Sequence, residues 1–162
     1  KLPIYITHTM NIYGERQNPE KYVPMCIEKI KNDERLQIHI NTKTNTIGSR
    51  CYLHAQDVAD ALLFLLKLDN VEFPKNHRGG KCPKFNISSS VEINNLEIAQ
   101  LIAEAMDKNL NYELVDPNIE RPGHDFRYLI SGEYLKSLGW KPKIETKERL
   151  KQLVQWYIKH GD

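Results

Sequence analysis

The segment Glu120–Tyr128 reads E-R-P-G-H-D-F-R-Y and combines a turn with a cluster of cationic groups. Its central Pro-Gly pair predicts a turn, because proline presets one backbone angle and glycine accepts conformations that other residues avoid. Arg121, His124 and Arg127 surround that turn, and guanidinium groups match phosphate oxygens with paired hydrogen bonds. The segment therefore predicts either a phosphate-binding loop or a solvated basic loop whose charges pair with neighbouring carboxylates.

A second patterned segment lies near the start of the chain. Asn11–Gly14 reads N-I-Y-G, Gln17 follows it, and Pro19–Pro24 reads P-E-K-Y-V-P. Together with R-P-G-H-D-x-R-Y, this N-x-Y-G-x-x-Q-x-P-E-K-x-x-P run resembles the sugar-nucleotide 4,6-dehydratases. The resemblance is to the dTDP-glucose 4,6-dehydratase group of the extended short-chain dehydrogenases/reductases, and it covers almost the whole chain.

Alternating strand and helix patterns predict an α/β fold. Strand patterns lie at residues 3–9, 36–40, 50–53, 85–88 and 111–115, and helix patterns lie at 20–31, 56–68, 94–106, 133–138 and 148–159. An Asn-x-x-Glu capping box at 94–97 opens the third helix, and Gly139 ends the fourth. We expect the first strand to be buried, and we expect the helix at 56–68 to have an apolar face and a polar face. The apolar face consists of Val58, Ala61, Leu62, Leu65 and Leu66, and the polar face carries Asp57 and Asp60.

The resemblance also implies which part of a larger enzyme this chain represents. The chain has no G-x-x-G-x-x-G turn and no Tyr-x-x-x-Lys pair, and it opens on a β-branched run without a methionine. We therefore expect residues 1–162 to form the C-terminal portion of an extended short-chain dehydrogenase/reductase. That portion contains the last Rossmann strands and the small mixed α/β substrate-binding lobe, and the N-terminal dinucleotide-binding half is absent.

Composition excludes several other classes of function. A formal net charge of +2 is too small to predict binding to nucleic acid or to a membrane surface. Three scattered cysteines predict neither a disulfide framework nor a zinc site, and the six histidines show no metal-ligand spacing. The serine run at 88–90 lacks a Gly-x-Ser-x-Gly frame, so serine hydrolase chemistry is not indicated. We expect reduced thiols, a cytoplasmic protein and no bound metal.

The resemblance implies a set of residues that bind a nucleotide-diphosphate sugar. Asn11 and Arg50 match contacts of the substrate diphosphate, Arg121 and His124 match phosphate and nucleoside contacts, and His39 lies where a residue packs on the base. The full set of substrate-binding positions is Asn11, Lys21, Tyr22, His39, Arg50, Asn95, Arg121 and His124. No catalytic residue is expected in this chain, because the matching positions precede Lys1.

Three of these positions also have an ordinary structural interpretation. Asn11 fits a turn, Lys21 fits an exposed helix surface, and Asn95 fits a helix cap. Ile12 occupies the position where family members often carry a second asparagine near the nicotinamide cofactor, so it is the one cofactor-side residue we expect here.

Two departures weaken the match to a dTDP sugar more than the match to a nucleotide sugar. Gln37-Ile38-His39 stands where the family has a Pro-x-Tyr pair that packs on the base. Arg50-Cys51-Tyr52 stands where the family usually has Arg-Asp-(Trp/Phe). The base, thymine or uracil, therefore stays open.

The resemblance implies the substrate-binding portion of an NAD-dependent dTDP- or UDP-glucose 4,6-dehydratase, a lyase that makes a 4-keto-6-deoxy sugar. It implies that the intact protein is a homodimer and that NAD is bound mainly by the missing half. This chain alone is then expected to be inactive. The alternatives are an epimerase or decarboxylase of the same superfamily, and a stand-alone module that binds a nucleotide or phosphate.

Overall fold

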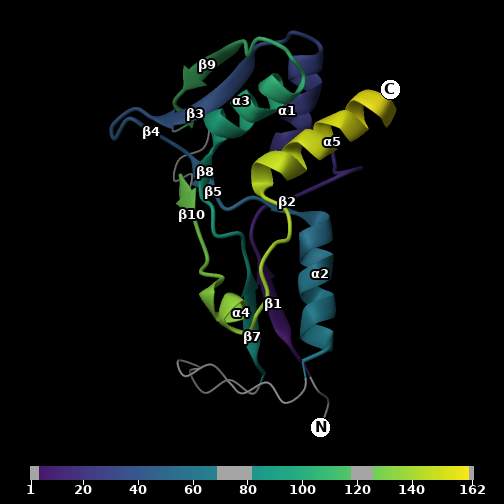
Figure 1. Ribbon diagram of the computed structural model, residues 1–162. Helices are drawn as coiled ribbons and strands as arrows, with labels where there is room; N and C mark the ends of the chain where they lie inside the picture. The colour runs from purple at the N-terminus through teal and green to yellow at the C-terminus, as the bar shows by residue number, and fades with distance from the viewer. Residues whose placement is uncertain (1–3, 69–81, 118–125, 161–162) are drawn as a thin grey trace.

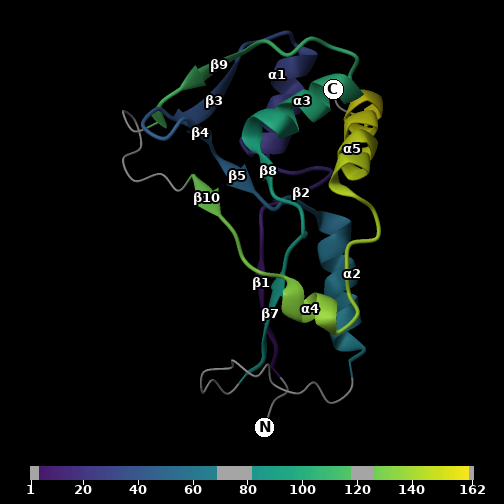
Figure 2. The ribbon, with the colours of Figure 1, turned by 60° about the vertical axis from the view of Figure 1, so that its left-hand side comes forward.

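The computed structural model describes residues 4–68, 82–117 and 126–160, and it confirms the α/β fold class (Figure 1). Helices and short strands alternate along the chain, and they gather into two hydrophobic cores. Figures 1 and 2 show an upper and a lower part of the chain, and each part contains one of the two cores. Short strand pairs connect the two parts.

The upper part in Figure 1 contains three helices and a small mixed sheet. The helices are α1 (Tyr22–Lys31), α3 (Asn95–Ala105) and α5 (Thr146–His160). The sheet has the order β4-β3-β9, from β3 (Leu36–Asn41), β4 (Thr46–Ile47) and β9 (Tyr112–Val115). β3 pairs antiparallel with β4, so these two strands form a hairpin, and β3 pairs parallel with β9.

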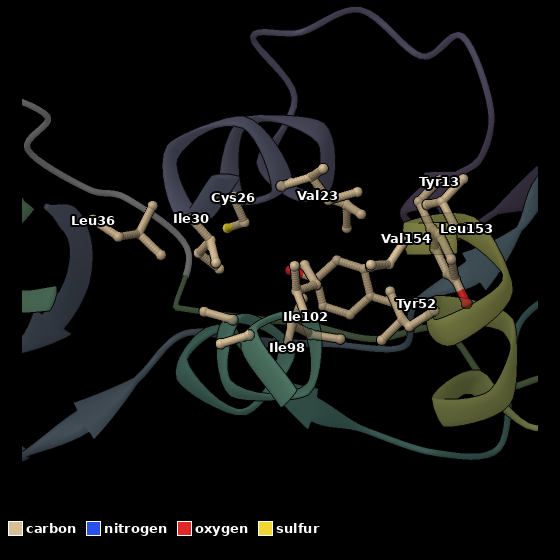
Figure 3. Packing of buried hydrophobic residues seen from close by; sticks show 14 of the residues in the cluster. Tyr13, Val23, Cys26, Ile30, Leu36, Tyr52, Ile98, Ile102, Leu153 and Val154 are labelled. Atoms are coloured by element: carbon tan, nitrogen blue, oxygen red, sulfur yellow. The ribbon is translucent and has the colours of Figure 1, made fainter. Parts of the chain in front are cut away.

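The upper core forms because each helix directs a 3.6-residue stripe of apolar side chains inward. Figure 3 shows the labelled residues of α1, α3 and α5 facing one another, among them Cys26, Ile98 and Leu153. Leu36 and Ile38 of β3 are fully buried beneath these helices, whereas Gln37 between them is exposed. The alternation predicted for this strand is therefore confirmed.

The lower part contains a parallel strand pair and two helices. The strands are β1 (Ile6–Thr9) and β7 (Lys84–Ile87), and the helices are α2 (Ala55–Leu66) and α4 (Glu133–Ser137). Phe85 and Ile87 of β7 are fully buried against Leu65 of α2 and Leu135 of α4. Among the described residues, β7 is the only strand that pairs with β1.

Two further strand groups lie between the cores. β2 (Ile12–Tyr13) pairs parallel with β6 (Leu53–His54). A second group has the order β10-β5-β8, from β10 (Arg127–Tyr128), β5 (Ser49–Arg50) and β8 (Ile93–Asn94). The single strand expected at residues 50–53 is therefore two separate strands, β5 and β6, which pair with different partners.

A buried ion pair joins α2 to α5. Arg149 donates from Nη2 to Oδ1 of Asp57 at 3.1 Å and from Nε to Oδ2 at 3.3 Å. The side chains are only 13% and 5% exposed. The expectation that Asp57 lies on the polar face of its helix is therefore wrong. Its charge is buried because a guanidinium far along the chain pairs with it, which is the condition under which charges are found inside proteins.

Two other burial expectations are wrong for a related reason. Leu62 and Leu66 of α2 are exposed, Leu66 by 77%, because α2 contacts its neighbours mainly through Ala61 and Leu65. The first strand was expected to be buried, but Ile4, Tyr5 and Ile6 are all more than a third exposed. A strand with one neighbour leaves its second edge and much of its surface to solvent.

The predicted helix ends are confirmed. Oδ1 of Asn94 accepts a hydrogen bond from the backbone N–H of Glu97 at 2.9 Å, as the capping box requires. Gly139 follows α4 with φ of +106°, a conformation that favours glycine. α2 has an unexpected cap, because Nδ1 of His54 accepts from the backbone N–H of Gln56 at 3.2 Å. That bond assigns the ring proton of a neutral His54 to Nε2.

Candidate functional site

One pocket of about 390 Å³ gathers most of the predicted substrate-binding residues that the structure describes. Asn11, Tyr22, His39, Arg50 and Asn95 all line it. They come from five parts of the chain that only the fold brings together: the residue before β2, the start of α1, strand β3, strand β5 and the start of α3. The remaining lining residues are Glu20, Met25, Lys29, Leu36, Gln37 and Tyr52.

The pocket lies where two helices begin. Tyr22 is the first residue of α1 and Asn95 is the first residue of α3, and both line the wall. The amino-terminal end of a helix carries a partial positive charge and backbone N–H groups, both of which favour an anion. Arg50 and Lys29 add cationic side chains, whereas Glu20 adds one carboxylate at an exposed edge.

Two tyrosines, the buried Tyr52 and the half-buried Tyr22, hold Asn95 in place. The hydroxyl of Tyr22 donates to the backbone oxygen of Asn95 at 2.7 Å, and the hydroxyl of Tyr52 donates to its Oδ1 at 2.7 Å. Burial raises the pKa of both tyrosines well above the ordinary value, and the neighbouring Cys26 raises them further. Both hydroxyls therefore stay protonated and can act as donors at neutral pH.

Arg50 is oriented by backbone carbonyl groups. Its Nη1 donates to the oxygen of Phe126 at 2.8 Å and to the oxygen of Ser49 at 2.6 Å. The Phe126 oxygen also accepts from the backbone N–H of Ser49 at 2.9 Å. The end of the E-R-P-G-H-D-F-R-Y segment is thus joined directly to the arginine expected to bind a diphosphate.

The other predicted positions lie outside the pocket wall or outside the described residues. Lys21 precedes α1 as its N-cap and is exposed. Ile12 is on β2, 39% exposed, and opposite Leu53. Arg121 and His124 lie outside the described residues. Their roles stay predictions.

Residue-by-residue matching missed several members of the pocket. Tyr52 was noted only as a departure from an expected Trp or Phe, yet its hydroxyl bonds Asn95. Gln37 was noted as a departure at the base-packing position, and it lies on the same exposed face of β3 as His39. The alternation in β3 was the signal that could have placed Gln37 beside His39.

The described residues do not by themselves fit a dinucleotide or a metal. Ile12 offers an exposed apolar side chain that can pack against a ring but donates no hydrogen bond. Within the described ranges, no group of three or more His, Cys, Asp or Glu side chains is placed to hold a metal ion. No helix in the same ranges is long and apolar enough to cross a membrane.

Residues 1–153 match the family model described as GDP-mannose 4,6 dehydratase. The chain is 32% identical to a dTDP-D-glucose 4,6-dehydratase of Bos taurus over 161 residues, which is 97% of this chain and 41% of that protein. It is 29% identical to a dTDP-glucose 4,6-dehydratase of Xanthomonas campestris pv. campestris over 97% of this chain and 43% of that protein.

Solved structures show the same relationship. The fold is similar to a dTDP-glucose 4,6-dehydratase from Bacillus anthracis in complex with NAD, with a TM-score of 0.77 and 28% identity, over 98% of this chain and 46% of that one. A Thermus thermophilus UDP-glucose 4-epimerase in complex with NAD also gives a TM-score of 0.77, over 98% of this chain and 47% of that one, but at 22% identity it shows the fold alone. The chain spans less than half the length of these relatives.

Proposed function

Because the chain belongs to the GDP-mannose 4,6-dehydratase family, we propose that it is the nucleotide-sugar-binding portion of an NAD-dependent nucleotide-sugar 4,6-dehydratase. The substrate is a dTDP- or UDP-glucose, and the product of the intact enzyme is a 4-keto-6-deoxy sugar. The named relatives that support this reaction are dTDP-glucose 4,6-dehydratases.

The observation that carries the proposal is the convergence of Asn11, Tyr22, His39, Arg50 and Asn95 on one pocket. The motifs that predict those residues lie far apart in the sequence, and the fold brings the residues together. A pocket with an arginine and two helix starts suits a diphosphate, which carries negative charge on oxygens that accept hydrogen bonds. His39 and Gln37 on β3 offer a flat ring and an amide to a nucleoside base.

In this proposal the chain contributes binding and orientation. Contacts to the diphosphate lie away from the sugar carbons that react, and such remote binding energy serves to position the reacting part of a substrate. NAD, when bound, supplies the hydride transfer of the dehydratase reaction. Its binding is assigned mainly to residues that this chain does not contain, with Ile12 as the one contact proposed from here. The chain alone is therefore inactive.

The first test is isothermal titration of the 162-residue chain with dTDP-glucose and with UDP-glucose, with inorganic phosphate as a control ligand. Loss of the Arg50 guanidinium removes charge-assisted hydrogen bonds, so Arg50→Ala should weaken nucleotide binding by about 10- to 100-fold. Lys147→Ala is the matched control. It also removes one positive charge, but Lys147 pairs with Glu104 and does not line the pocket.

Equal affinity in Arg50→Ala and Lys147→Ala would refute the assignment of this pocket. Turnover of either nucleotide-glucose by the chain with NAD would refute the proposal that it is inactive alone. Binding of phosphate as tightly as either nucleotide sugar would favour a general phosphate-binding module instead.

A further inference from the structure

We propose that Glu92 is a positioning residue for this site, because it holds the strand that orients Arg50. Glu92 binds Arg127 of β10, and Phe126, the residue just before β10, presents the carbonyl group to which Arg50 is bonded. This inference rests on the proposed function, since it assigns Arg50 to the substrate diphosphate. Neither Glu92 nor Arg127 lines the pocket, so any effect of their substitution must reach the ligand through other residues.

Glu92 and Arg127 form a bidentate ion pair. Arg127 donates from Nε to Oε1 of Glu92 at 2.9 Å and from Nη2 to Oε2 at 2.8 Å. The hydroxyl of Ser49 donates to the same Oε1 at 2.5 Å. These donors hold the pKa of Glu92 at about 2, with Arg127 as the largest cause and Ser49 next. A carboxylate with three short donors stays ionised and fixes the direction of the guanidinium.

The contacts close into a ring that includes Arg50. Arg127 lies opposite Ser49 in the β10–β5 pairing, and Arg50 lies opposite Ile93 in the β5–β8 pairing. Ile93 directly follows Glu92, and Phe126 directly precedes Arg127. Phe126, whose carbonyl group accepts from Arg50, is therefore next to Arg127 in the sequence. Glu92, whose carboxylate binds Arg127, is next to Ile93, the strand partner of Arg50.

The short strand needs this support. β10 has only two residues, and a pairing of that length supplies few backbone hydrogen bonds. The approach of β10 to the turn before β5 is also close. A Cβ added at Gly48 would lie 3.3 Å from the oxygen of Phe126, so a side chain there would push the carbonyl away. Gly48 permits the close approach, and Glu92 supports it through its contacts with Arg127 and Ser49.

Isolated surface ion pairs contribute little, and the side chain of Arg127 is 68% exposed. The pair at Glu92 differs because it is bidentate, shares its acceptor with Ser49, and bridges two strands. Its expected effect is therefore on the geometry of Arg50 more than on the stability of the fold.

The test is a double-mutant cycle on the 162-residue chain. Isothermal titration measures the affinity for dTDP or UDP, whichever the wild-type chain binds more tightly. Glu92→Gln should weaken binding about three- to fivefold, and it should have no further effect in an Arg50→Ala background. Arg127→Lys keeps the positive charge but cannot make the bidentate contact with Glu92, so it should weaken binding to a similar extent. Glu104→Gln is the matched control, because it breaks an exposed ion pair with Lys147 outside the pocket.

The proposal is overturned if Glu92→Gln behaves like Glu104→Gln, or if its effect is the same with and without Arg50. A second readout separates this inference from the proposed function. The Nε–Hε NMR signal of Arg50 should report increased mobility in Glu92→Gln and no change in Glu104→Gln. If the wild-type chain binds neither dTDP nor UDP, the proposed function fails, and the NMR signal alone decides whether Glu92 orients Arg50.

Discussion

Breaking the ion pair between Asp57 and Arg149 should destabilise the whole chain. Arg149→Met leaves the Asp57 carboxylate 5% exposed and without either of its guanidinium bonds. Removal of one partner from a buried pair costs about 3–5 kcal/mol, because the remaining charge is neither solvated nor paired. For a chain of this size, that cost corresponds to a fall in the melting temperature of about 10 °C.

Urea unfolding at neutral pH measures the loss directly. The control is Lys147→Met, which breaks a 3.4 Å pair with Glu104 whose side chains are 54% and 59% exposed. That change should cost less than about 1 kcal/mol. Asp57→Leu combined with Arg149→Met should cost much less than the sum of the two single changes, since no unpaired charge is left.

Equal unfolding free energies for Arg149→Met and Lys147→Met would refute this reasoning. Additive costs in the double variant would also contradict it. Either result would mean that the carboxylate gains water or another partner when the guanidinium is lost.

Two further predictions concern pH and a helix end. Burial lowers the pKa of His54 below 6.5, and Glu15 only partly offsets this, so the unfolded chain binds more protons just below 6.5. The free energy of unfolding should therefore fall as pH drops through 6.5, and His54→Asn, which retains a side-chain acceptor for the helix cap, should flatten this slope in urea unfolding. Gly139→Ala should cost about 1 kcal/mol in the same assay, because alanine is strained at φ of +106° although the site has room for a methyl group; a neutral result would contradict the strain argument.

Helix ends and strand alternation were predicted correctly where they depend on residues close together in the sequence. The capping box at Asn94 and the stop at Gly139 depend on residues a few positions apart. The alternation of Leu36–Asn41 depends only on the two faces of one strand. These features could be identified without knowledge of the rest of the fold.

Burial was harder to predict because it depends on distant partners. Nothing near Asp57 in the sequence indicates that Arg149 will cover it. In the same helix, Leu62 and Leu66 read as core residues, yet the described neighbours of α2 leave them exposed. A helix pattern gives the direction of an apolar stripe but not the width of the surface that meets it.

The pocket likewise contains some residues that the sequence could predict and others that only the structure reveals. Motif resemblance selected Arg50 and Asn95, and the structure places both at one wall. It could not select Tyr52 or Glu92, whose importance lies in hydrogen bonds to residues far away in the chain. A motif can indicate residues that are expected to bind a ligand, whereas the residues that hold them in place are found only from contacts in the structure.

The second edge of β1 is a surface on which folded chains can pair, and such pairing does not depend on the stability of the fold. Within the described residues that edge meets no other strand, and Ile4 and Ile6 beside it are exposed. A strand edge with apolar neighbours is a template on which another chain can add. If another chain adds to this edge, the species that self-associates is the native one. The process should then follow protein concentration, and substitutions that raise the melting temperature should not prevent it. A charged side chain introduced along β1 should reduce such association.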